Sequence, residues 1–117
     1  YYSLPLVRRH IDLNEPSIRL RKMTFEEFQL STKEDHAPIE IDPLLLALWY
    51  DAKGDWVKSH AIVQDIDSKD ASMIHAYLHR KERDDWNADY WYQRAGRKRT
   101  NDTIEYEWNS LVSRFIS

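Results

Sequence analysis

The sequence contains no cysteine, which excludes disulfide bonds, cysteine-ligated zinc or iron–sulfur sites, and a cysteine nucleophile. Only two glycines and four prolines occur among 117 residues, so glycine-rich phosphate loops and turn-rich β-sandwiches are not expected. No apolar run approaches the roughly 20 residues that a membrane-spanning helix needs. No serine has the glycine-flanked context of a hydrolase nucleophile. We therefore expect a cytoplasmic protein with no contact to membranes.

The composition favours one ordinary folded domain. Hydrophobic residues make up 42% of the chain and include five tryptophans and seven tyrosines, enough to build a single core at this length. Charged residues make up 32%, and the net charge of −3 gives no overall attraction to nucleic acid.

The charge is divided unevenly along the chain. Residues 1–22 carry five basic and two acidic side chains, a net +3, whereas residues 23–117 carry 12 basic and 18 acidic side chains, a net −6. Thr24 and Glu27 form a capping-box pattern immediately after this change. We therefore expect an N-terminal basic extension over 1–22 and a single helical domain over 23–117.

Helix signals continue to the end of the chain. Asp42, Asp55 and Asp84 have the character of N-caps, and Gly54 and Gly96 of helix stops. Apolar residues follow with helical spacing, first at Leu45, Leu48, Trp49 and Ala52 and later up to Phe115. From this spacing we expect a core that contains Leu45, Leu48, Trp49, Ile62, Val63, Ile74, Leu78, Trp91, Trp108 and Leu111. No segment alternates apolar and polar residues over a length that predicts a strand, so the predicted fold class is all-α.

A short repeat lies within the predicted helices. Leu48, Asp55 and Trp56 recur 30 residues later as Leu78, Asp85 and Trp86, each set spanning a helix, a tight turn and a helix. Since neither unit can bury its apolar stripe alone, we expect stacked antiparallel helical hairpins of tetratricopeptide-like style with a C-terminal capping helix.

The chain resembles a small bacterial family of short helical proteins. The resemblance is carried by the runs 46–56, 75–82 (HAYLHRKE) and 87–96 (NADYWYQRAG), and extends over about 23–116. The sequence departs from the family at Arg83, where a small residue is usual, and in its longer N-terminus. The family is associated with no catalytic motif, so the resemblance implies a helical fold and no particular reaction.

Two histidines and a glutamate form the sharpest chemical candidate. His75, His79 and Glu82 follow at i, i+4 and i+7 and share one flank of a helix. A metal could bind there with His60 or Asp85 as a further ligand, and acid–base chemistry is a second alternative. The same residues also suit a hydrogen-bonded seam between helices, so we expect no metal and no cofactor.

Aromatic and basic residues supply the other candidates. Tyr90 lies off the buried stripe and one turn before Arg94. Together with Trp49 or Trp86 it could line a groove for a peptide or an aromatic ligand. The basic run 97–99 extends Arg94 into a positive patch, which single-stranded nucleic acid could use.

The predicted function is a protein- or peptide-interaction module rather than an enzyme, and no catalytic residue is assigned. The tentative binding residues are Trp49, His75, His79, Glu82, Tyr90 and Arg94. The alternatives are a small ligand-binding protein or enzyme that uses the His75/His79/Glu82 flank, and weak nucleic-acid association through residues 94–99.

Overall fold

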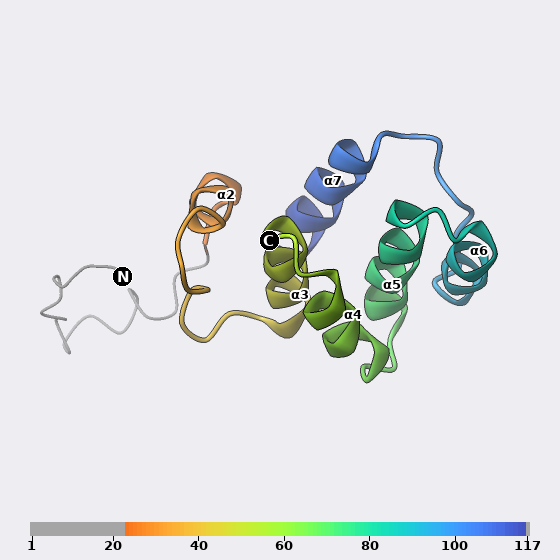
Figure 1. Ribbon diagram of the computed structural model, residues 1–117, viewed down its shortest axis with the longest axis horizontal. Coiled ribbons are helices and arrows are strands. Elements are labelled where there is room, and N and C mark those ends of the chain that lie inside the picture. Colours follow the sequence, from red (N-terminus) through yellow and green to blue (C-terminus); the bar gives the residue numbers. More distant parts are fainter. Residues whose placement is uncertain (1–22, 117) are drawn as a thin grey trace, which may run out of the picture.

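A computed structural model describes residues 23–116, and within them every regular element is a helix. Figure 1 shows their arrangement. The bounds are α2 (Phe25–Ser31), α3 (Pro43–Ala52), α4 (Trp56–Gln64), α5 (Lys69–Lys81), α6 (Asp85–Arg94) and α7 (Ile104–Ile116). The all-α prediction is confirmed. The predicted basic extension, 1–22, lies outside the described residues.

Side chains at the helix starts explain why the chain divides at these points. The capping box of α2 is complete, with the Glu27 amide donating to the Thr24 hydroxyl oxygen and the Thr24 amide donating to the Glu27 carboxylate. The carboxylates of Asp42, Asp55 and Asp84 accept backbone hydrogen bonds at the starts of α3, α4 and α6. Each cap satisfies amides that a helix start leaves unpaired, and these predicted caps are confirmed.

Helices α3 and α4 form one hairpin, and α5 and α6 form a second. In each turn a residue with positive φ, Gly54 (83°) or Arg83 (65°), precedes the aspartate that caps the next helix, Asp55 or Asp84. The two turns are therefore equivalent at an offset of 29 residues, and not at the 30 that identical residues indicate. Arg83 occupies a left-handed position that favours glycine.

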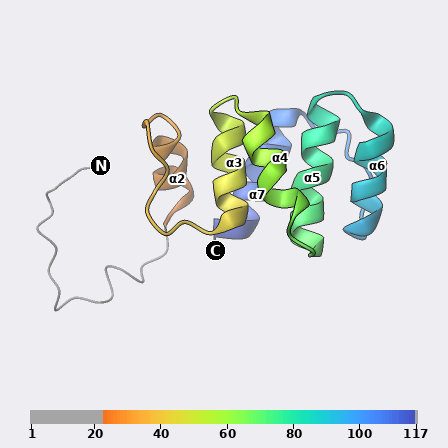
Figure 2. The same cartoon turned by 60° about the horizontal axis from the view of Figure 1, so that its bottom comes forward.

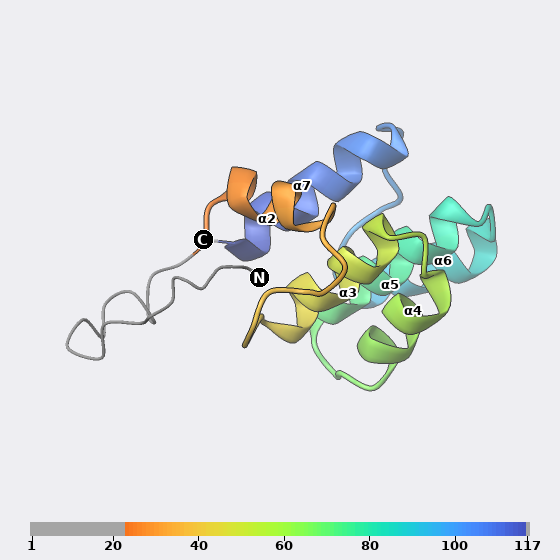
Figure 3. The same ribbon diagram turned by 60° about the vertical axis from the view of Figure 1, so that its left-hand side comes forward.

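Helix α7 lies across the first helices of both hairpins. It packs closely on α3 and α5, and among the described residues it is linked to α6 by the hydrogen bond from the Tyr92 hydroxyl to Glu107. In Figure 2 it runs behind α3, α4 and α5, and Figure 3 shows α2 beside it. The indole of Trp108 donates to the Leu48 carbonyl (3.1 Å) and packs against Phe25 and Phe28 of α2. The C-terminal helix thus packs on α3 and α5, the first helices of the two hairpins. It does not lie beyond α6 at the end of the second hairpin.

The main core lies between α3, α4, α5 and α7. Seven of its fully or nearly fully buried residues were predicted from the apolar spacing: Leu45, Leu48, Trp49, Val63, Ile74, Leu78 and Leu111. Three other predicted core residues, Ile62, Trp91 and Trp108, are only partly buried. Among the described helices, none has the length and apolar content that crossing a membrane requires.

Candidate functional site

Three histidines meet where the two hairpins join. His60 comes from α4, and His75 and His79 lie one turn apart on α5. The Nε2 atoms of His60 and His75 are 2.9 Å apart, and one ligand nitrogen from each of the three rings lies within 4.8 Å of the others. We call these residues the histidine cluster.

Two indole rings enclose the histidine cluster. Trp56 stacks on His60, with ring centroids 4.7 Å apart, and Trp91 from α6 stacks on His75 at 3.8 Å. The Trp56 indole donates to the Leu78 carbonyl (2.8 Å), which fixes α4 against the end of α5. The cluster is therefore held by three helices from both hairpins.

Burial disfavours the charged forms of His60 and His75. His75 is only 4% exposed. Burial, with the neighbouring His60 and His79, lowers the pKa of His75 to about 3. The pKa of His60 is also lowered, chiefly by burial and then by His79. His60 and His75 thus present neutral rings at neutral pH.

The polar groups of the cluster are incompletely paired. The Nδ1 atoms of His75 and His79 are buried and have no hydrogen-bond partner among the described residues. His79 Nδ1 lies 3.5 Å from a carboxylate oxygen of Glu82, an ion-pair distance rather than a hydrogen bond. The structure brings the predicted residues His75, His79 and Glu82 together. His60 from α4 is the third histidine beside them.

The other predicted site residues fall into two places. Trp49 is 3% exposed and donates through its indole to the Ser31 carbonyl (3.0 Å), so it belongs to the core and lies apart from Tyr90. Tyr90 is 44% exposed on α6, and the Arg94 guanidinium lies 5.9 Å from its ring centre. Neighbouring Trp86, 77% exposed, stacks on Tyr90 with centroids 6.4 Å apart.

A buried carboxylate in α3 was not anticipated as a polar centre. Asp51 accepts from the Tyr77 hydroxyl (2.6 Å) and from the Lys81 ammonium (2.8 Å). Burial and the adjacent carboxylate raise the pKa of Tyr77 above its usual range. The sequence offered one signal for this centre: Asp51 is a charged residue that lies between the apolar positions Leu48 and Ala52 of the predicted helix.

A second buried carboxylate joins α5, α6 and α7. Glu107 accepts from the guanidinium of Arg80 (2.9 Å) and from the Tyr92 hydroxyl (2.5 Å). Burial, followed by the hydrogen bond to Glu107, raises the pKa of Tyr92. Because each partner comes from a different helix, this group positions α7 as well as satisfying the charge.

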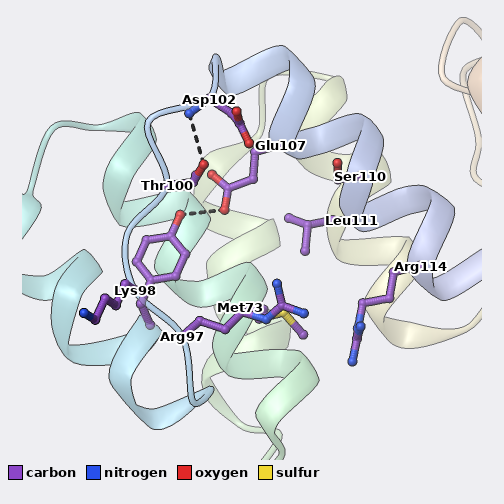
Figure 4. Close-up of a pocket in the computed structure, with 10 residues that line it drawn as sticks. Met73, Arg97, Lys98, Thr100, Asp102, Glu107, Ser110, Leu111 and Arg114 are labelled. Atoms are coloured by element: carbon purple, nitrogen blue, oxygen red, sulfur yellow. Dashed lines mark hydrogen bonds between the residues drawn. The ribbon is translucent and has the colours of Figure 1, made fainter.

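The linker between α6 and α7 borders two hollows. A pocket of about 290 Å³ lies between α5, α7 and this linker, with Glu107 extending into it beside Thr100 (Figure 4). Arg97 and Lys98 line it and also a wider hollow of about 790 Å³ on α6. The positive patch predicted from the sequence therefore borders concave surface.

Comparisons with known proteins add no relative to this picture. The chain matches no protein-family model, and neither curated proteins nor solved structures include a significant match. The resemblance given above stays a prediction, and function has to be argued from the site itself.

Proposed function

We propose that the chain is a peptide-binding module that uses the outer surface of α6. We define the α6 face as Trp86, Tyr90 and Arg94, which follow at intervals of four residues and so share one side of the helix. The observation that carries the proposal is the exposure of Trp86: 77% of this large apolar side chain lies open to solvent next to a half-exposed Tyr90.

The position of α6 explains why this surface is open. Among the described helices α6 packs closely against α5 alone. A hydrogen bond from Tyr92 to Glu107 links it to α7, which covers α3 and α5. Stacked aromatic rings on an uncovered helix offer a large, rigid apolar surface at low entropic cost. Tryptophan, tyrosine and arginine are also the residues most enriched where binding energy is concentrated in protein interfaces.

Charge selects the kind of peptide. The two exposed carboxylates of α6, Asp85 and Asp89, are both held by Arg99 at 2.7 and 3.0 Å. Arg97 and Lys98 form no ion pair among the described residues, and Arg94 has only a distant one, 3.9 Å from Asp67. The charge left for a partner is positive, so the peptide we propose combines a large apolar side chain with neighbouring carboxylates.

Single-stranded nucleic acid would use the same aromatic and basic residues. The net charge of −6 over 23–117 opposes a long polyanion more than it opposes a peptide with one or two carboxylates. The peptide is therefore the better match.

A phage-displayed peptide library tests the proposal. Peptides are selected on the full chain, and their binding is then compared with that to Trp86→Ala. Tyr106→Ala serves as a matched control because Tyr106 is also an exposed aromatic residue (59%), on α7. We expect acidic, apolar peptides whose binding falls at least about tenfold in Trp86→Ala and is unchanged in Tyr106→Ala.

Three results would contradict the proposal. They are the absence of any selected peptide that depends on Trp86, the enrichment of basic peptides, and equal losses in the two variants. Trp86-dependent binding of fluorescent oligothymidylate with a steep salt dependence would assign the α6 face to nucleic acid instead. Concentration-dependent dimerisation that Trp86→Ala abolishes would make a second copy of the chain the occupant.

A further inference from the structure

We infer that the histidine cluster is a binding site for one zinc-class transition-metal ion, held by the imidazoles of His60, His75 and His79. The sequence alone favoured a hydrogen-bonded seam and offered His60 only as a possible further ligand. The structure places His60 against His75 and His79, which changes the balance between these two interpretations.

The geometry is close to that of a metal site. Ligand nitrogens 2.0–2.1 Å from a tetrahedral zinc ion lie about 3.3 Å apart. The Nε2 atoms of His60 and His75 are 2.9 Å apart, and all three rings offer a nitrogen within 4.8 Å of the other two. None of these separations exceeds the value for zinc by more than about 1.5 Å, so the three nitrogens already lie at the scale of one coordination sphere.

A seam without metal uses these groups poorly. Three buried or half-buried rings make one hydrogen bond to one another, between the Nε2 atoms of His60 and His75, and among the described residues none joins either ring to His79. Buried polar atoms are almost always paired in folded proteins. A metal ion accepts a lone pair from each ring at once, which a hydrogen bond between two imidazoles cannot do.

The surroundings also suit a bound ion. A histidine that binds a metal through one ring nitrogen usually donates from the other to a carboxylate. Glu82 lies 3.5 Å from His79 Nδ1 and is placed for this role. The stacked indoles of Trp56 and Trp91 restrict the rings of His60 and His75 and shield the site from water.

The donor set selects the metal. Three imidazole ligands favour Zn²⁺, Co²⁺, Ni²⁺ or Cu²⁺ over Mg²⁺ and Ca²⁺, which prefer oxygen ligands. A second grouping, His79 with Glu82 and Asp84, is the weaker site. Asp84 already uses both of its carboxylate oxygens to bind Asn87 at the start of α6.

The test is a titration of the full, untagged chain with zinc after treatment with EDTA, followed by calorimetry. Each cluster histidine has a matched control in His36, which is exposed and lies in the loop before α3. We expect one zinc per chain, with affinity at least about 100-fold weaker in His60→Gln and in His79→Gln and unchanged in His36→Gln. Circular dichroism checks that each variant keeps its helices.

Cobalt gives an independent readout that needs no variant. The wild-type chain loaded with Co²⁺ should show the intense visible absorption of a four-coordinate ion, and copper should quench the fluorescence of the adjoining indoles. The inference is wrong if wild type binds no zinc, if His60→Gln binds as tightly as wild type, if His36→Gln is weakened as much as His60→Gln, or if cobalt gives only the weak bands of a six-coordinate ion.

Discussion

Acidification should destabilise the metal-free protein through His75. This ring has a pKa of about 3 in the folded chain, against an ordinary value of 6.5 when it is unfolded. Between these two values the unfolded state binds a proton that the folded state excludes, so the free energy of unfolding falls as the pH falls. The stability that the neutral His75 ring contributes is fully retained only above about pH 6.5.

The size of the effect follows from the two pKa values. Lowering the pH from 7 to 5 should cost about 2 kcal/mol through His75 alone, since one pKa unit corresponds to about 1.4 kcal/mol. The titratable groups that face the ring are His60 from α4 and His79 from α5. The pKa of His60 is lowered as well, so this ring also makes the free energy of unfolding fall as the pH falls.

Urea unfolding in the presence of EDTA, followed by circular dichroism at pH 7 and pH 5, measures this loss. His75→Phe is the matched variant, because it keeps a ring against Trp91 and cannot titrate. The difference between the two pH values should shrink by about 2 kcal/mol in this variant. An equal loss in wild type and His75→Phe would refute the reasoning that this ring is buried in its neutral form.

Glu107→Ala should cost about 3 kcal/mol of stability by leaving the buried guanidinium of Arg80 without its carboxylate; thermal unfolding unchanged from wild type would show that the ion pair contributes nothing. Arg83→Gly should stabilise the chain by up to about 1 kcal/mol, because a side chain at φ 65° is strained there. Gly54→Ala should destabilise it by about 1 kcal/mol through the backbone alone, since no atom lies within 4 Å of an added Cβ; chemical denaturation checks both signs, and the same sign for the two would contradict the turn equivalence. Trp91→Ala should cost about 3 kcal/mol, and an unchanged melting temperature would place this indole outside the packing of α5 and α6.

The helix starts were predictable because each is written in adjacent residues. Thr24 with Glu27, Asp42 with the following proline, and Asp84 all act locally, whatever the rest of the chain does. The all-α class follows from such signals and from the spacing of apolar residues.

The register of the two hairpins was not predictable from matching residues. The second turn places Arg83 where the first has Gly54, so the glycine that marks the turn is missing from the second hairpin. Identical letters then align Trp56 with Trp86, although Trp56 packs against α5 and Trp86 is exposed. The geometry of the turns therefore aligns the two hairpins more reliably than identity at a few positions does.

Long-range partners were the other limit. The spacing of His75 and His79 placed two rings on one flank, but only the packing of α4 against α5 decides that His60 joins them. Likewise, Asp51 and Glu107 acquire their partners from helices far along the chain. A local pattern identifies such residues as candidates, and the fold selects among them.

X-ray absorption at the zinc edge tests most directly whether three imidazoles converge on one ion between α4 and α5. For the chain loaded with one equivalent of zinc, we predict three imidazole ligands at about 2.0–2.1 Å, falling to two in His60→Gln. A spectrum fitted by oxygen ligands alone, or one that is the same in wild type and His60→Gln, would contradict the proposal that His60, His75 and His79 bind one zinc ion.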